Sequence, residues 1–309
     1  MDTVKHIREQ AKQHKKTIVL PEYDDKRIIE AARIIEEEGI AETVVLSPDR
    51  VSPQEKERFI AEYTELHRVK HHDPAEVRRM FEDPLYPAAM MTRAGVFDGL
   101  VAGAGHTTPD MARAAIRCLE IDERISIVSS SFIMDVPRCR YGEEGTFVFA
   151  DCGIIPDPNA RQLSCIALSA AEFASKVLKL TPRIAFLSYS TKGSAKTKSA
   201  NKITEALDNL QAMSPGILAD GELQVDAAIV PEVAEIKFPD SPVGGRANVL
   251  IFPDLEAGNI GYKLVERLAG ARAIGPVMLG LNRPASDLSR GCSIDDIVDC
   301  TAVTAICAQ

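Results

Sequence analysis

The segment 287–296, DLSRGCSIDD, gathers residue types that could do chemistry. Ser293 and Asp296 have the spacing of a capping box, which predicts that a helix begins here. Helix capping does not explain Ser289 and Arg290, which stand just before the cap with a glycine beside them. Arginine, serine and glycine at the positive end of a helix are typical of a pocket for an anion. The segment therefore predicts an anion site, and whether a proton acceptor lies beside it stays open, because helix capping by itself accounts for Ser293 and Asp296.

A second basic segment is 188–199, SYSTKGSAKTKS, which follows the apolar run RIAFL. Its spacing differs from G-x-x-x-x-G-K-[ST], so we reject a nucleoside triphosphatase loop. Backbone N–H groups together with Lys192 and Ser194 could still form an anion cradle. A solvated basic turn that starts a helix is the competing and simpler interpretation.

The segment 103–117, GAGHTTPDMARAAIR, has the signals of a helix start. Thr107 or Thr108 can cap the helix, and a proline stands at its first position. Arg113 lies about one turn further along. A guanidinium near a hydroxyl-rich helix start suits phosphate oxygens, so Arg113 is a candidate phosphate ligand, whereas His106 is expected to be structural.

An acidic group occurs in 220–232, DGELQVDAAIVPE, where Asp220, Glu222 and Asp226 stand close together. Clustered acids could bind a metal, but no histidine stands at a supporting spacing. We therefore expect them to hydrogen-bond neighbouring loops. The apolar part, DAAIVP at 226–231, is predicted to be a strand.

The elements that must position these residues alternate between short apolar runs and amphipathic helices. Such alternation predicts an α/β fold with largely parallel sheets, whose ligands bind beyond the carboxyl ends of the strands. We expect one domain over 1–125 and a second over 126–289, with a C-terminal helix at about 290–309 that packs back on the first domain. The expected strands include 17–22, 41–47, 98–105, 125–134, 145–153, 183–190 and 248–254, and the clearest helices are 24–40 and 161–178.

The composition limits the classes of function. The chain has 309 residues and a net charge of −9, which argues against a nucleic acid or an anionic membrane as partner of the whole surface. Its seven cysteines show no C-x-x-C spacing, so a disulfide framework or a structural zinc site is not expected. The N-terminal segment has no apolar core of a secretory signal, and no apolar run approaches the length of a membrane span. We expect a cytoplasmic protein.

Taken together, the motifs resemble the phosphate acetyltransferase (phosphotransacetylase) family. The resemblance rests on LSRGCSIDDIV, LSYSTKGSAKTKS, DGELQVDAAIVP, NVLIFPDLEAGNIGYK and YGEEGTFVFAD, and also on KTIVLPEYDDKRIIEAA and DGLVAGAGHTTPDMAR. It covers nearly the whole chain and is most specific from about residue 140 onward. The family converts acetyl-CoA and phosphate into CoA and acetyl phosphate, reversibly.

The resemblance implies a fold of two α/β domains with the active site in the cleft between them, similar in layout to the isocitrate and isopropylmalate dehydrogenases. It implies that Ser289, Arg290 and Asp296 are catalytic and that Arg113 binds phosphate. It places Cys139 near the site, where we expect packing and no nucleophilic role. It further implies a homodimer, CoA and acetyl phosphate as substrates, and no metal or redox cofactor.

Two roles are open for Asp296, and both follow from CoA chemistry. A thiol with a pKa near ~8.5 is only slightly ionised at neutral pH, so a base helps to form the thiolate. Asp296 either accepts that proton or positions the thiol beside Arg290. The thiolate then attacks the acetyl carbonyl directly, while Ser289 and Arg290 stabilise the developing negative charge.

One segment departs from the family pattern. The family has a second phosphate-binding arginine in a stretch E-L-R-K-H-K-G, whereas this chain reads ELHRVKHHD at 65–73. His67 occupies the arginine position and Arg68 follows it, about 100° further round a helix. Arg68 could reach the phosphate through a local shift, His67 could bind it more weakly, or the contact is lost.

Three other functions remain to be weighed. A phosphate butyryltransferase would differ mainly in its acyl preference. An acetyl-CoA-responsive regulatory module, of the kind appended to malic enzymes, would not need Ser289, Arg290 and Asp296. A dehydrogenase of similar fold would need a dinucleotide site, and no convincing G-x-G-x-x-G motif follows a strand.

Overall fold

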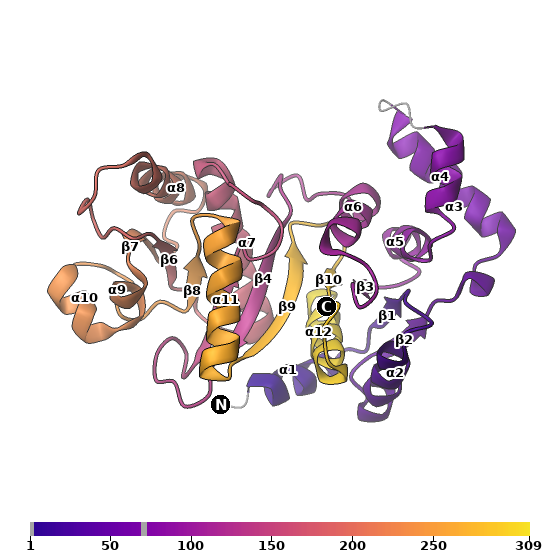
Figure 1. Ribbon diagram of the computed structural model, residues 1–309, viewed down its shortest axis with the longest axis horizontal. Coiled ribbons are helices and arrows are strands. Elements are labelled where there is room, and N and C mark those ends of the chain that lie inside the picture. The colour runs from indigo at the N-terminus through magenta and orange to yellow at the C-terminus, as the bar shows by residue number, and fades with distance from the viewer. Residues whose placement is uncertain (1–2, 69–72) are drawn as a thin grey trace. The chain divides into compact units, whose positions relative to one another are not determined.

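The computed structural model describes residues 3–68 and 73–309, and Figure 1 shows their helices and strands. The chain divides into two compact units. We call Val4–Ile121 with Leu281–Gln309 the terminal unit, and Asp122–Gly280 with Thr3 the central unit. The predicted α/β fold class is confirmed, because parallel strands and helices build both units.

The terminal unit contains a parallel sheet in the order β2-β1-β3-β10. Its strands are β1 (Thr17–Leu20), β2 (Glu42–Val45), β3 (Gly99–Ala102) and β10 (Ala285–Asp287). β10 comes from the far end of the chain and pairs with β3, with Asp287 opposite Ala102. Because β1, β3 and β10 are parallel neighbours, the turns that follow them meet at one edge of the sheet.

Helices flank this sheet on both sides. In Figure 1 α5 and α6 lie above the strands and α2 and α12 lie below them, and the helices of each pair pack against each other. The helical segments of this unit are α1 (Thr3–Ala11), α2 (Lys26–Glu38), a 3-10 turn (Pro48–Arg50), α3 (Pro53–Leu66), α4 (Pro74–Met80), α5 (Leu85–Arg93), α6 (Thr108–Leu119) and α12 (Ile294–Cys307).

The predicted helix over 24–40 is confirmed as α2, and its limits have clear physical causes. Asp25 caps the start by accepting a hydrogen bond from the backbone N–H of Arg27. Gly39 ends the helix with a φ of 71°, a conformation that glycine adopts without steric cost. One stripe of the helix, which includes Ile28 and Ile35, is buried in the core.

The central unit has strands in the order β9-β4-β5-β8-β6-β7. β4 is antiparallel to both β5 and β9, and the strands from β5 to β7 run parallel. The strands are β4 (Ser129–Asp135), β5 (Thr146–Ala150), β6 (Ile184–Leu187), β7 (Ala219–Leu223), β8 (Val249–Ile251) and β9 (Arg272–Leu279). The helices are α7 (Ala160–Leu178), α8 (Lys198–Met213), α9 (Val225–Ile229), α10 (Pro231–Lys237) and α11 (Leu255–Ala269).

Two details differ from the sequence-based expectations. The predicted strand at 226–231 is wrong, since these residues form α9 and the start of α10, and β7 lies just before them. A short apolar run cannot distinguish a buried strand from a buried helix by periodicity, and its two alanines favour the helix. The expected second domain extends to residue 289, whereas residues 281–289 lie in the terminal unit because β10 pairs with β3.

Candidate functional site

Three turns meet at the carboxyl edge of the terminal sheet. They follow β1, β3 and β10, and they comprise residues 21–25, 103–107 and 288–292. The backbone N–H of Leu288 donates to the carbonyl of Ala102 over 2.6 Å, which extends the β3–β10 pairing into the last of these turns. We call residues 289–291 the SRG turn and residues 103–106 the GAGH turn.

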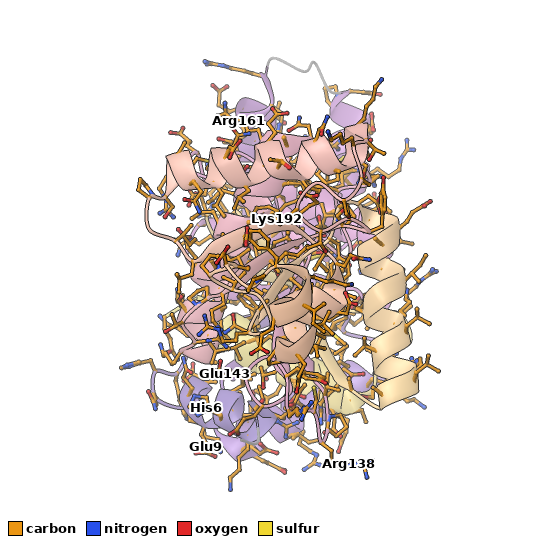
Figure 2. All side chains as sticks on the ribbon, turned by 90° about the vertical axis from the view of Figure 1, so that its left-hand side faces the viewer. His6, Glu9, Arg138, Glu143, Arg161 and Lys192 are labelled. Carbon is orange, nitrogen blue, oxygen red and sulfur yellow. The ribbon has the colours of Figure 1, made fainter. Side chains whose placement is uncertain are left out.

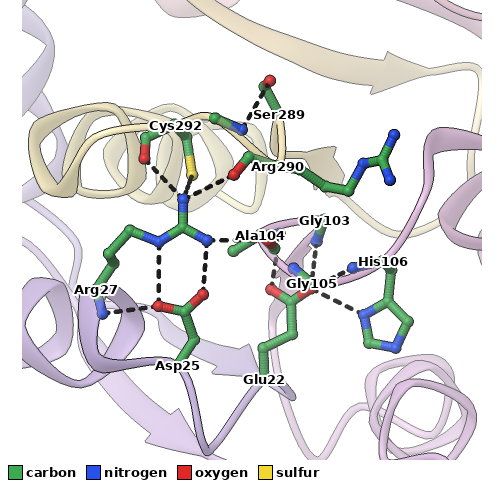
Figure 3. Close-up of polar contacts among 11 residues, drawn as sticks. Glu22, Asp25, Arg27, Gly103, Ala104, Gly105, His106, Ser289, Arg290 and Cys292 are labelled. Carbon is green, nitrogen blue, oxygen red and sulfur yellow. Dashed lines mark hydrogen bonds and ion pairs between the residues drawn. The ribbon is translucent and has the colours of Figure 1, made fainter.

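Arg27 ties the three turns together, as Figure 3 shows. One guanidinium nitrogen, Nη1, donates to the carbonyls of Arg290 and Cys292 over 2.9 and 3.0 Å. The other, Nη2, donates to the carbonyl of Ala104 over 2.9 Å and to the carboxylate of Asp25 over 2.6 Å. The hydrogen bond from Arg27 also lowers the pKa of Asp25. Arg27 therefore fixes the backbone of the SRG turn from a different element.

Glu22 organises the GAGH turn. Glu22 is a buried residue, only 5 % exposed. Its carboxylate accepts hydrogen bonds from four successive backbone N–H groups, those of Gly103, Ala104, Gly105 and His106, over 3.0, 3.0, 2.7 and 3.1 Å. Burial works to raise the pKa of Glu22, but the hydrogen bonds from His106 and the backbone outweigh it and the net shift is downward.

His106 lies between two carboxylates. Its Nε2 is 3.1 Å from Asp83 and its Nδ1 is 2.8 Å from Glu22. Asp83 and then Glu22 raise the pKa of His106 to about 10, so the ring is an imidazolium at neutral pH. With both ring nitrogens committed, His106 has the structural role that the sequence predicted for it.

The SRG turn exposes its side chains while its backbone is held. Ser289 Oγ accepts from the N–H of Gly291 over 3.2 Å, and both Ser289 and Arg290 are exposed. Within the residues that the structure describes, the guanidinium of Arg290 pairs with no carboxylate. Charge that develops on a bound substrate can therefore meet an arginine that is not already neutralised.

Asp296 stands in the first turn of α12 and is half-buried. Its Oδ2 accepts from the N–H of Ser293 over 2.8 Å, and its own N–H donates to Ser293 Oγ over 3.2 Å. The predicted capping box is thus confirmed. The cap uses Oδ2, which leaves the other carboxyl oxygen as the atom that could accept a proton.

The candidate phosphate ligands after β3 lie at the start of α6. Thr107 caps the helix and donates to Asp110 over 2.6 Å. Arg113 is about half-exposed and donates to the same carboxylate over 2.9 Å. The Thr108 hydroxyl faces Asp287, at the end of β10. Among the described residues, the ion pair of Arg113 is this exposed one within its own helix, which costs little to exchange for a phosphate.

The residues at the departure from the family pattern are both engaged elsewhere. His67 Nε2 bonds the carbonyl of Arg117 over 2.8 Å, and its ring centroid lies 4.6 Å from that of Tyr63. Arg68 is strongly exposed and donates to Glu65 over 2.9 Å. Residues 69–72 of the same stretch lie outside the described part of the chain.

In the central unit, the loop after β6 closes on itself. Lys192 contacts the buried carboxylate of Asp220 and donates to the carbonyl of Gly221 over 2.8 Å. Ser194 Oγ lies 3.0 Å from Ser190 Oγ and accepts from the N–H of Thr191.

Two buried acids, Asp220 and Glu222, hold this loop. Glu222 accepts from the N–H of Gly193 over 2.7 Å and from the hydroxyl of Ser190 over 2.9 Å. The structural role predicted for Asp220 and Glu222 is confirmed. The ion pair with Asp220 largely neutralises the charge of Lys192 within the central unit.

Cys139 and Lys192 occupy opposite edges of the central sheet. Cys139 lies in the connection from β4 to β5, at the amino end of β5, and it packs on the core cluster that includes Phe147. Lys192 follows β6, which runs parallel to β5 through β8. Figure 2 shows Lys192 well separated from Glu143, which belongs to the same connection as Cys139. Within this unit the structure does not bring the two candidates together.

Sequence reasoning missed Arg27, Glu22 and Asp287. Arg27 lies inside a regular amphipathic helix pattern, and its partners Ala104 and Arg290 are far away in the chain. The available signal was positional: Glu22 and Asp287 lie at or just beyond the carboxyl end of a strand, where α/β proteins place their sites, and Arg27 lies in the first turn of the helix that follows β1. The described residues contain no cluster of three or more histidines, cysteines or acids that could hold a metal ion. No described helix is long and apolar enough to cross a membrane.

The family model described as phosphate acetyl/butaryl transferase matches residues 2–305. A phosphate acetyltransferase of Thermoanaerobacterium thermosaccharolyticum is 46% identical over the whole of both chains, and that of Clostridium acetobutylicum is 42% identical over 100% of this chain and 99% of the relative.

Solved structures show the same likeness. A phosphotransacetylase from Streptococcus pyogenes has a TM-score of 0.91 at 36% identity, with 99% of this chain and 98% of that chain covered. A putative 4-hydroxythreonine-4-phosphate dehydrogenase from Salmonella typhimurium, at 12% identity and a TM-score of 0.54, shares the fold alone. The full-length match to the family model and the identities above show that this chain belongs to the phosphate acetyl/butaryl transferase family, whose members are acyltransferases.

Proposed function

We propose that the chain transfers an acetyl group reversibly between CoA and phosphate, so that acetyl-CoA and phosphate give CoA and acetyl phosphate. The relatives that match over their full length are named phosphate acetyltransferase. The observation that carries the proposal is the SRG turn, whose backbone is anchored by Arg27 while Ser289 and Arg290 stay exposed. Such a rigid support with free polar groups is what charge stabilisation in a transition state requires.

The chemistry follows from these groups. Asp296 accepts the proton of the CoA thiol, or holds the thiol while Arg290 favours its ionised form. The thiolate attacks the carbonyl carbon of acetyl phosphate, a C–S bond forms, and the bond from that carbon to the phosphate oxygen breaks. Ser289 and Arg290 stabilise the negative charge on the carbonyl oxygen and on the departing phosphate. Neither a covalent acyl-enzyme nor a redox step enters this route.

We propose that phosphate binds at the start of α6. Arg113 exchanges its exposed pair with Asp110 for the phosphate, whose oxygens the guanidinium fork fits. The hydroxyls of Thr107 and Thr108 stand at the same helix start, where the backbone dipole favours an anion. His67 and Arg68 remain candidates for a weaker second contact, and Lys192 and Ser194 remain candidates in the central unit.

The acyl group is the main alternative, since the family description names both acetyl and butaryl transfer. The full-length relatives favour acetyl. Rates with acetyl, propionyl and butyryl phosphate at equal CoA would decide between them. A regulatory module without chemistry is the second alternative, and it predicts CoA binding without turnover.

We also propose a cytoplasmic homodimer. The apolar residues Ile260, Leu264 and Leu268 form one stripe along α11 and are 58 %, 51 % and 82 % exposed. A stripe of this spacing suits a second copy of the same helix face. Leu264→Lys should shift the protein from dimer to monomer in light scattering, whereas Ile236→Lys, at an exposed apolar position of α10, should not.

The activity test is direct. The purified protein is mixed with acetyl phosphate and CoA, without added metal or nicotinamide, and thioester absorbance is followed. Asp296→Asn is compared with Asp295→Asn, which removes the neighbouring acid of the same helix turn. Loss of the cap by itself would lower stability by about 0.5–2 kcal/mol and would leave the turnover of the folded protein nearly unchanged. A large loss of turnover in Asp296→Asn, without a similar loss in Asp295→Asn, supports the chemical role. Equal and small effects in both variants would leave Asp296 as a cap only.

A further inference from the structure

Asp287 is a buried carboxyl that the route above does not use. It is the last residue of β10 and stands two residues before Ser289. The residue is 1 % exposed, although acids are almost never fully buried without a partner. Its position connects the sheet to the SRG turn.

The surroundings of Asp287 supply no ordinary hydrogen bond. Among the described residues, neither of its carboxyl oxygens has a partner of regular geometry, and the Thr108 hydroxyl is the polar group that faces it. A Cβ added at Gly103 would lie 2.5 Å from Asp287 Oδ1 and 2.4 Å from the carbonyl oxygen of Leu288. The carboxyl therefore lies directly against the backbone of the GAGH turn.

The reason for this isolation is Glu22. All four backbone N–H groups of the GAGH turn donate to Glu22, so none is left for Asp287 on the other side of the same turn. The charged groups that face Asp287 are Glu22 and the imidazolium of His106. On the α12 side the neighbouring strand residue, Ser286, has its hydroxyl 2.7 Å from that of Thr304.

An ionised Asp287 would be a buried charge with no regular hydrogen bond among the described residues and with the Thr108 hydroxyl as the donor that faces it. Burial accordingly raises the pKa of Asp287 to about 7, with Glu22 adding to the increase and Thr108 and His106 opposing it. Beyond the Thr108 hydroxyl and the charge of His106, a charged Asp287 could gain hydrogen bonds by drawing amides of the GAGH turn away from Glu22. That exchange would move backbone that lies against Leu288, the residue before the SRG turn, and that Arg27 links to the carbonyl of Arg290.

We propose that Asp287 is a positioning residue for Ser289 and Arg290, and that its carboxyl is uncharged in the active arrangement of the SRG turn. When Asp287 loses its proton to solvent, its carboxylate competes with Glu22 for the backbone N–H groups of the GAGH turn. This competition displaces the SRG turn. The positioning role rests on the proposed acyl transfer, whereas the protonation state does not. The consequence is a kcat that falls as the pH rises through about 7, although ionisation of the CoA thiol alone would make it rise.

The first experiment compares kcat against pH for the wild type and Asp287→Asn, which keeps the shape and cannot ionise. The variant is expected to retain kcat at low pH and to lack the alkaline decline, so that its kcat relative to wild type grows up to tenfold per pH unit above the transition. Ser286→Ala is the matched control in the same strand and should keep the wild-type profile. Parallel profiles for wild type and Asp287→Asn would overturn the proposal.

A second variant guards against failure of Asp287→Asn to fold. The Thr108 hydroxyl lowers the pKa of Asp287, so Thr108→Val should move the alkaline decline to higher pH. A decline that stays in place or moves to lower pH would count against the proposal.

An infrared measurement separates this proposal from the proposed function. The wild type below about pH 7 should show the C=O stretch of a protonated buried carboxylic acid, which disappears on titration and is absent in Asp287→Asn. Unfolding provides the same information: because the folded pKa is raised above the unfolded value of 3.8, the wild type should lose stability relative to Asp287→Asn as the pH rises from that value to about 7. A protein with this band and no turnover would refute the acyl transfer alone. A protein with turnover and no band would refute the role of Asp287.

Discussion

The SRG turn of the terminal unit and the loop after β6 of the central unit have similar compositions and different consequences. Each brings serine, glycine and a cation to the carboxyl end of a strand. In the central loop, Glu222 and Asp220 satisfy both the backbone and Lys192 from within. In the SRG turn, Arg27 satisfies only the backbone, and the guanidinium of Arg290 is left exposed. Residue types alone therefore predict chemistry poorly. What matters is whether the hydrogen-bond and ion-pair partners neutralise the side chains or hold only the backbone.

The largest effect should follow from removing the exposed cation. Arg290→Ala is expected to lower kcat by about 10²–10³, because a group that stabilises transition-state charge is lost, and the melting temperature should barely change for so exposed a side chain. Steady-state kinetics and calorimetry on the same sample provide the check. A loss of stability without a loss of kcat would contradict this prediction and would give the SRG turn the structural role of the loop after β6.

Removing the support of the SRG turn should have the next largest effect. Arg27→Lys cannot bridge Asp25, Ala104 and Arg290 at once, so the turn loses its fixed position and kcat is expected to fall about 10–100-fold. Arg33→Lys is the matched control, since Arg33 lies in the same helix and forms surface ion pairs with Glu30 and Glu37. Labelling of Cys292 by a thiol reagent should accelerate in Arg27→Lys only. A rise in KM with unchanged kcat and labelling would instead indicate that Arg27 contacts a substrate.

The central loop should respond in the opposite way. Lys192→Met leaves the carboxylate of Asp220, which is 4 % exposed, without its cation, so the unit should lose about 1–3 kcal/mol of stability. We expect kcat to change less than threefold. Urea unfolding and the thioester assay test both statements, and a large loss of kcat with intact stability would restore Lys192 as a substrate ligand.

The smallest effect at neutral pH concerns the clamp on the GAGH turn. The folded pKa of His106 is raised to about 10 from 6.5, so its contribution to stability is complete below about pH 6.5 and is lost as the pH rises through about 10. Wild-type stability should therefore decline between these values, by at most about 1.4 kcal/mol per pH unit. His106→Gln should remove this part of the decline in thermal melts at several pH values. An unchanged pH dependence would mean that Glu22 holds the turn without the imidazolium.

Much of the architecture could be predicted from local sequence patterns. The residues that hold the turns of the candidate site in place could not. The amphipathic stripe at 24–40 and the capping box at Ser293 and Asp296 are short-range signals, and both are confirmed. The strand predicted for the DAAIVP segment is wrong, because a short apolar run fits either a strand or a helix.

The site itself was partly predictable for the same reason. Ser289 and Arg290 are candidates from the sequence because a cap does not explain them, and their role stays a prediction. Arg27, Glu22 and Asp287 were not identified, because their importance depends on the neighbouring order of β1, β3 and β10, which no local pattern contains.

The order of β10 in the terminal sheet has a consequence for biosynthesis. Residues 4–121 leave the ribosome long before β10 and α12, yet β3 and α2 pack against exactly those late elements. While translation proceeds, the nascent terminal unit must wait with an open edge at β3 and an uncovered apolar face on α2. Ser289, Arg290 and Asp296 arrive on the same late segment that closes this edge. Closure of the terminal sheet and arrival of these candidate site residues therefore fall in the same late step of synthesis.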